Sequence, residues 1–165
     1  PYTTQPENKM SILEDYEKEC MYERDAWFID EIIEIDSVNQ RVIGRLDTSK
    51  LTTLVSQQRV WPGHPKHFPG AVAVQMTATL GQLHAIYILG LRATEGWVGF
   101  GTHIKTAKFG ALGEIGPEVI AQVTCLRARQ IRGTWFTDYA FEYTQKGKRL
   151  YTSTQTAAWV QGTPD

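Results

Sequence analysis

The chain has 165 residues, of which 42% are hydrophobic and 21% charged, and its formal net charge is -1. This length suits a single domain with a sizeable core, and the near-neutral charge gives no electrostatic basis for binding nucleic acid or an anionic membrane. Cys20 and Cys125 are the only cysteines and lie far apart in the chain. We therefore expect a protein of the reducing cytoplasm with no disulfide framework, no metal and no other cofactor.

The N-terminal half begins with polar sequence and then turns to short apolar segments. Residues 1–10 are polar and contain two prolines, which predicts a flexible lead followed by one domain over residues 11–165. An acidic stretch at 11–24 is compatible with a helix. Segments rich in isoleucine and valine at 26–35 and 41–47 are separated by a polar turn, which predicts two strands.

A long helix is expected in the middle of the chain, after a loop over residues 50–69. No proline and no carboxylate interrupts residues 71–90, so this segment can form one helix of roughly 30 Å. Apolar residues occupy most of its circumference, which is typical of a helix enclosed by the rest of the fold. Gln75, Gln82 and His84 interrupt the apolar run, and this favours a buried helix over a membrane span.

The last third of the chain reads as strands. Four segments rich in valine, threonine and aromatic residues cover residues 97–109, 118–132, 134–145 and 149–161. Short glycine-containing turns separate the last three. The order of elements predicts an α+β fold in which one antiparallel sheet wraps around one long central helix.

The most specific stretch lies directly before the helix, from Val60 to Gly70, and reads VWPGHPKHFPG. It resembles the signature of the 3-hydroxyacyl-carrier-protein dehydratases, in which an aromatic strand end, a Gly-His pair and a helix-opening Pro-Gly follow in this order. Lys108-Phe109 and a closing strand like 151–159 also match, so the resemblance spans about residues 27–160. It implies the hotdog fold and an acyl thioester substrate.

Dehydration of a 3-hydroxyacyl thioester needs a base, an acid and hydrogen-bond donors at the thioester oxygen. By resemblance, the amide N–H of Gly70 is such a donor, and the positive end of the helix dipole supports it. The family histidine comes nine residues before this glycine, whereas His64 comes six before it and His67 three. The aromatic-x-Gly-His context favours His64 as the catalytic histidine, with His67 as the alternative. We interpret His84 and His103 as structural.

A second departure concerns the acid. The family has an aspartate or glutamate five residues after the glycine, where this chain has Gln75, and no carboxylate occurs between Asp47 and Glu95. Gln75 cannot exchange a proton as a carboxylate can. It shares one stripe of the helix with Thr79 and Gln82. That stripe either faces a substrate or water, or ties the helix to the sheet or to a twin helix.

The resemblance favours a 3-hydroxyacyl thioester dehydratase of fatty acid or polyketide biosynthesis. A thioesterase, in which Gln75 and Thr79 position a water molecule, and a non-catalytic acyl-binding protein are the alternatives. The family also implies a homodimer joined edge to edge and a substrate delivered on acyl carrier protein or coenzyme A. The residues expected to bind the substrate beside the helix are Phe68, Val72, Met76, Thr79 and Phe109.

Overall fold

A computed structural model describes residues 6–162, with side chains described from Ile12 onward. Two helices and six strands form its main elements. In chain order they are α1 (Pro6–Glu19), β1 (Glu31–Asp36), β2 (Arg41–Leu46), α2 (Gly70–Tyr87), β3 (Trp97–Phe109), β4 (Val119–Ile131), β5 (Thr134–Gln145) and β6 (Lys148–Gln161). The predicted long helix and the six predicted strands are therefore confirmed, with bounds shifted by a few residues.

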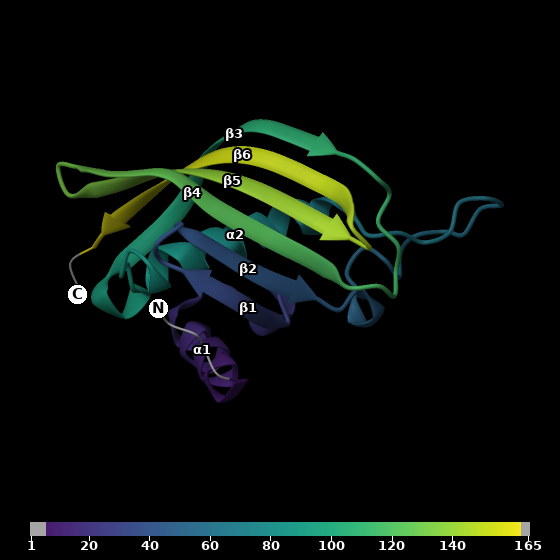
Figure 1. Ribbon diagram of the computed structural model, residues 1–165, viewed down its shortest axis with the longest axis horizontal. Helices are drawn as coiled ribbons and strands as arrows, with labels where there is room; N and C mark the ends of the chain where they lie inside the picture. The colour runs from purple at the N-terminus through teal and green to yellow at the C-terminus, as the bar shows by residue number, and fades with distance from the viewer. Residues whose placement is uncertain (1–5, 163–165) are drawn as a thin grey trace.

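The six strands form one antiparallel sheet with the order β1-β2-β4-β5-β6-β3. The sheet arches over α2, with β3 at one edge and β1 at the other (Figure 1). The turns after β4 and β5 each consist of two residues with positive φ, Arg132-Gly133 and Lys146-Gly147. Such turns match the twist of an antiparallel pair and fix its register. The expected α+β architecture, a sheet wrapped around a central helix, is confirmed.

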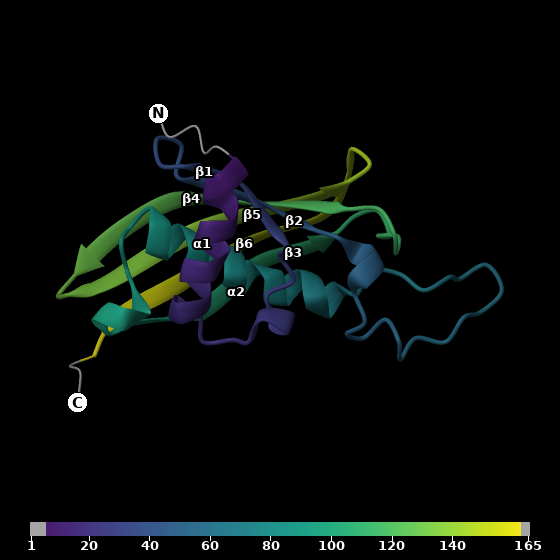
Figure 2. The ribbon, with the colours of Figure 1, turned by 90° about the horizontal axis from the view of Figure 1, so that it is seen from below.

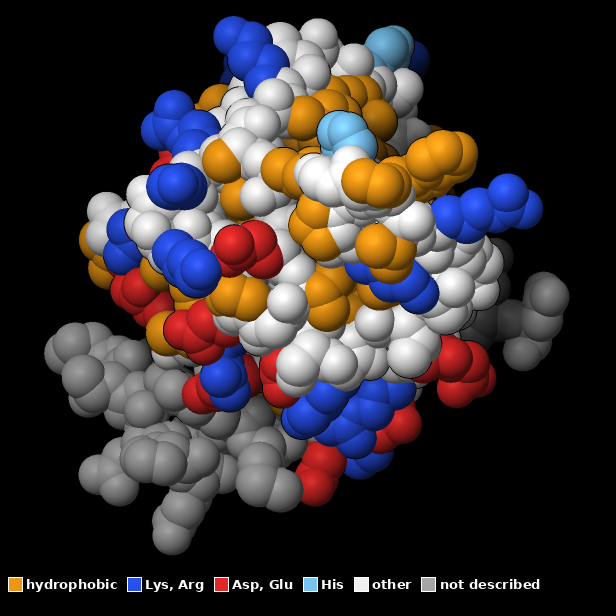
Figure 3. Space-filling model, turned by 90° about the vertical axis from the view of Figure 1, so that its right-hand side faces the viewer, with side chains coloured by type: hydrophobic (Ala, Val, Ile, Leu, Met, Phe, Trp, Pro, Cys, Tyr) orange, Lys and Arg blue, Asp and Glu red, His pale blue; other side chains and the backbone are white. Residues whose placement is uncertain are grey.

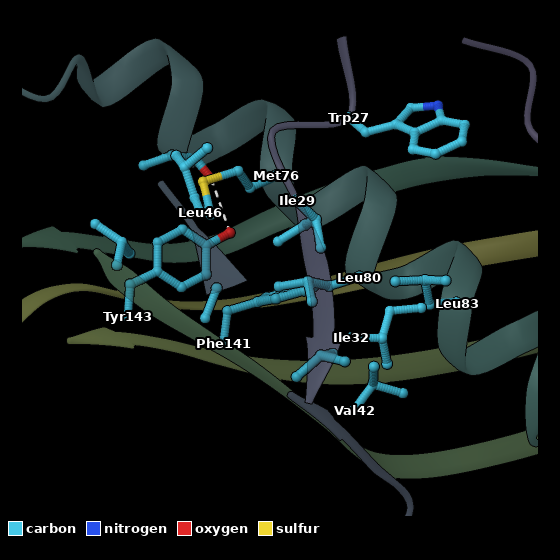
Figure 4. Close-up of a cluster of buried hydrophobic side chains, with 14 of the residues drawn as sticks. Trp27, Ile29, Ile32, Val42, Leu46, Met76, Leu80, Leu83, Phe141 and Tyr143 are labelled. Carbon is cyan, nitrogen blue, oxygen red and sulfur yellow. Dashed lines mark hydrogen bonds between the residues drawn. The ribbon is translucent and has the colours of Figure 1, made fainter. Parts of the chain in front are cut away.

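The concave side of the sheet encloses α2 in a continuous apolar core (Figure 4). Leu80 and Leu83 of the helix are fully buried, as are Val42 and Tyr143 of the strands. The hydroxyl of Tyr143 donates to the carbonyl of Ala73 at 2.8 Å, which fixes the first half of α2 against β5. Among the described residues, no helix is both long and apolar enough to cross a membrane.

Helix α1 crosses the side of α2 that the sheet does not cover (Figure 2). The hydroxyl of Tyr16 donates to Gln82 Oε1 at 2.7 Å, and that of Tyr87 donates to Asp15 Oδ2 at 2.9 Å. The helix begins at Pro6, so it includes residues 6–10 of the expected flexible lead. Residues 1–5 lie outside the described residues, and the division into lead and single domain stays a prediction.

Candidate functional site

The start of α2 carries backbone N–H groups that no side chain caps. Its first residue, Gly70, follows the extended residue Pro69. A Cβ at Gly70 would lie 2.9 Å from Cε1 of Phe109, so the ring of Phe109 packs directly on this glycine. Uncapped N–H groups at the positive end of a helix attract a carbonyl oxygen or an anion. The role of the Gly70 N–H at a thioester oxygen stays a prediction.

The two candidate histidines lie in different surroundings. His67 is half-buried, and its backbone N–H and carbonyl both bond to the amide of Gln58, at 2.9 Å each. His64 is exposed and pairs through its backbone with Trp61 across a tight turn. Gln58 thus fixes the backbone of His67 three residues before Gly70, whereas His64 belongs to the exposed part of the loop.

This loop, over residues 51–69, projects from the end of the molecule (Figure 2). Hydrophobic side chains gather around a histidine on that end (Figure 3). The exposed apolar residues of the loop include Val60 and Trp61, which are 71% and 63% exposed. Contiguous exposed apolar patches are frequent at interaction sites, so this end of the molecule is a candidate contact surface.

A cavity of about 530 Å³ lies between α2 and the strands β3 and β6. Gln75 lines it, and the Nε2 atom of Gln75 is buried without a hydrogen-bond partner among the described residues. Gly99 of β3 lies so close to the indole of Trp159 that a Cβ there would overlap it. The indole is held by a bond from its Nε1 to Thr137 Oγ1 at 3.0 Å. The cavity thus has a rigid wall and an unsatisfied donor.

The polar stripe that the sequence indicated on α2 is divided between two roles. Gln75 and Gln82 both line the cavity. Thr79 is buried on the other side, where its hydroxyl donates to the carbonyl of Trp27 at 2.9 Å. Gln82 also bonds to Tyr16 of α1. Gln75 and Gln82 thus face a cavity, whereas the bonds of Thr79 and Gln82 tie α2 to Trp27 and to α1, neither of which is the sheet or a twin helix.

The residues expected to bind substrate lie largely in the core. Phe68, Val72 and Met76 are buried in the apolar cluster, and Phe109 covers Gly70. None of them lines the cavity, and neither does Thr79. The physical reason is that the sheet covers this side of α2, while the open side is the one bearing Gln75 and Gln82. A role in substrate binding for these five residues stays a prediction.

A buried hydrogen-bonded chain passes through His84. The amide Nε2 of Gln40 donates to Ser37 O, so its Oε1 accepts from His84 Nε2 at 3.0 Å. His84 Nδ1 then accepts from the hydroxyl of Tyr139 at 2.9 Å. Burial lowers the pKa of the His84 imidazole to about 4, so the neutral ring is the stable form. This fits the structural role inferred for it, while the exposed His103 lines the cavity.

Two functional candidates were not visible in the sequence. The hydroxyl of Tyr151 is buried without a partner among the described residues, and its ring lies 5.2 Å from that of Phe109. Tyr16 reaches Gln82 across 66 residues of sequence. An apolar strand pattern gives no sign of an unpaired hydroxyl, and no local motif links two residues so far apart.

No protein-family model and no curated protein matches the sequence. Among solved structures, a mutant thioesterase from Pseudomonas aeruginosa is 16% identical with a TM-score of 0.60, and the match covers 97% of this chain and 96% of that one. The dehydratase heterocomplex ApeI:P from Xenorhabdus doucetiae is 16% identical with a TM-score of 0.64, over 89% and 90% of the chains. A thioesterase from Haemophilus influenzae is 18% identical with a TM-score of 0.59, over 90% of each chain.

These similarities establish the fold. The six-stranded antiparallel sheet around one long helix is the hotdog fold, as the sequence resemblance implied. The similar structures include thioesterases as well as a dehydratase. The fold is therefore compatible with both chemistries, and the choice between them depends on the site residues.

The buried imidazole predicts a loss of stability in acid. The unfolded His84 takes up a proton at its ordinary pKa of 6.5, whereas the folded one resists protonation down to about pH 4. Stability is therefore fully present above pH 6.5, and we expect it to fall by about 3 kcal/mol as the pH drops to about 4. Urea unfolding at a series of pH values measures this. The variant His84→Gln should be less stable than the parent at pH 7 but should lose less of its free energy of unfolding on acidification. If the free energies of parent and variant changed equally with pH, His84 would not be the group responsible.

Proposed function

We propose that this protein acts on acyl thioesters and removes water from a 3-hydroxyacyl thioester. The observation that carries the proposal is the unpaired amide of Gln75, which lines a cavity five residues into α2, the helix whose uncapped start is at Gly70. The N–H groups at Gly70 would polarise the thioester carbonyl, and Gln75 would hold the departing hydroxyl through its Nε2.

In this scheme a histidine removes the proton from C2 of the substrate. The C3–O bond then breaks, a double bond forms between C2 and C3, and the imidazolium returns its proton to the departing hydroxyl as water. Gln75 orients that hydroxyl but supplies no proton, so the histidine alone carries the proton transfer. For this role we prefer His67 to His64, because Gln58 fixes the backbone of His67, which precedes Gly70 by three residues.

A thioesterase is the second candidate. It is supported by the same amide, because Gln75 can orient a water molecule toward a thioester carbonyl held at Gly70. Thioesterases are also among the similar structures. A protein that binds acyl thioesters without turning them over is the third candidate.

An assay on three thioesters separates these candidates. We expect the protein to hydrate enoyl thioesters and dehydrate 3-hydroxyacyl thioesters, followed by the absorbance of the conjugated thioester, and to release thiol slowly from a saturated acyl thioester. His67→Ala should lower the rate by about 10²-fold or more, and the matched control His64→Ala should change it little. Rapid thiol release without hydration would favour the thioesterase, whereas activity lost only in His64→Ala would reverse the histidine assignment.

Gln75→Glu tests the position of the missing acid. The change restores a carboxylate of nearly the same size, and we expect dehydration to rise at least tenfold, within the 10²- to 10⁴-fold that acid–base catalysis typically contributes. Gln75→Ala should give no gain. Both variants must first be shown to fold, because a buried unpaired carboxylate is costly. An efficient parent with no gain in Gln75→Glu would mean that Gln75 does not occupy the position of the family acid and that the histidine or another group supplies the proton.

The proposal includes a homodimer that pairs through β3. This edge strand has 13 residues, all exposed or half-buried. The opposite edge, β1, has only six and carries the ion-paired residues Glu31, Glu34 and Asp36. Short edge strands that carry charged side chains resist pairing, whereas a long exposed edge strand leaves a row of unpaired N–H and C=O groups that a second copy can bind. We further propose delivery of the substrate on acyl carrier protein or coenzyme A in the cytoplasm, where the free thiols of Cys20 and Cys125 would stay reduced.

The variant Ile104→Asp tests the proposed pairing of two chains through β3. Ile104 lies near the middle of β3 and is 52% exposed, so an aspartate there should place two like charges near the dimer axis and shift the protein toward monomer. Val38→Asp, in the β1–β2 turn at the other edge, is the matched control and should leave the mass unchanged. Sedimentation velocity at several concentrations reports the mass. A parent that is monomeric, or a dimer that survives Ile104→Asp, would contradict the pairing.

A further inference from the structure

Two amides face the cavity from one side of α2. Gln75 and Gln82 both line it, and they are seven residues apart. Seven residues make almost two full helical turns, so the two side chains leave the helix in nearly the same direction, about 10 Å apart along its axis. A ligand lying along α2 would meet both of them.

The orientation of the Gln82 amide is fixed from within the chain. Its Oε1 accepts from the hydroxyl of Tyr16 at 2.7 Å and from the thiol of Cys20 at 3.3 Å. Burial raises the pKa of the Tyr16 hydroxyl well above its usual range, so this hydroxyl remains a donor. The acceptor end of Gln82 is thus in use, and its Nε2 has no partner among the described residues. Gln82, like Gln75, therefore offers the cavity a donor.

The other polar groups of the cavity largely satisfy one another. Gln155 accepts from Thr77 at 3.3 Å and donates to Ser153 at 3.1 Å. The hydroxyls of Thr102 and Thr156 pair at 2.5 Å. Among the described residues, no Lys, Arg, Asp or Glu lines the cavity. Gln75 and Gln82 thus each offer the cavity an amide donor, beside the exposed imidazole of His103, whose Nδ1 lies 3.4 Å from Thr156 Oγ1. An acceptor oxygen on the ligand suits two such amide donors.

We infer that the substrate of this site carries a second oxygen, a keto or hydroxyl group about 10 Å along the acyl chain from the reacting end, and that Gln82 Nε2 donates to it. The inference rests on the proposed function, since Gln75 is taken to mark the reacting end. It names the substrate class as oxygenated acyl thioesters in place of plain fatty acyl thioesters. Gln82 is then a specificity-determining residue, and Tyr16 is the residue that positions it.

Binding of unreactive analogues tests this separately from turnover. The probes are two pantetheine thioethers with alkyl chains of equal length. One chain is unsubstituted, and the other has a keto group about 10 Å from the end that corresponds to the reacting end of a substrate. We expect the parent to bind the keto analogue roughly three- to tenfold more tightly, as one net hydrogen bond provides. Gln82→Met should abolish this preference, whereas the exposed control Gln130→Met should keep it.

Tyr16→Phe separates positioning from a structural effect. Without the Tyr16 hydroxyl the Gln82 amide can rotate and exchange the positions of its oxygen and nitrogen. The affinity for the keto analogue relative to the plain analogue should therefore fall even where the protein stays folded. The inference would be overturned by any of three results: the parent binds both analogues equally, it binds neither, or Gln82→Met alters only the oligomeric state. The analogues report binding without reaction. If the protein turns over none of the thioesters but still prefers the keto analogue, only the dehydratase proposal is refuted.

Discussion

The structure depends on the need to enclose α2. This helix is apolar around most of its circumference, and an apolar helix is stable in water only when other elements cover it. The sheet covers most of α2 and α1 crosses part of the rest, while the polar groups on the covered sides bond to neighbouring elements, as Thr79 does to Trp27 and His84 to Tyr139. The remaining stripe, facing β3, is where the cavity lies. The candidate site is therefore the part of the helix that the fold leaves uncovered.

The main elements could be predicted because their signals are local. Proline and glycine before Gly70 start the helix, and glycine-containing turns separate strands of clear β pattern. The side of α2 that stays open could not be predicted, because it depends on how far the sheet extends. For that reason the sequence could not show that Val72 and Met76 lie in the core and do not line the cavity. The bond from Tyr16 to Gln82 joins residues 66 positions apart and leaves no local pattern.

The histidine loop shows how far a motif determines a site. The spacing from the motif to the helix differs from that of the family it resembles, and sequence context alone favoured His64. Our proposal of His67 instead uses contacts that only a folded chain makes, because the amide of Gln58 bonds to the backbone N–H and carbonyl of His67. A motif therefore identified the segment correctly as the approach to the helix, but the residue that can act depends on the length and bonding of the loop.

The sheet order also has a consequence for how the chain folds. Two-residue turns join β4, β5 and β6, so this meander can form from local contacts. The strand β3 pairs with β6 only across a separation that runs from 42 residues, at Phe109 and Tyr151, to 64 residues, at Trp97 and Gln161. Closing that loop costs conformational entropy, and β3 gains hydrogen bonds from only one neighbouring strand of the chain, β6. Within one chain the strand that closes the cavity is thus held by a single neighbour, and loss of the β3–β6 pairing would open the cavity.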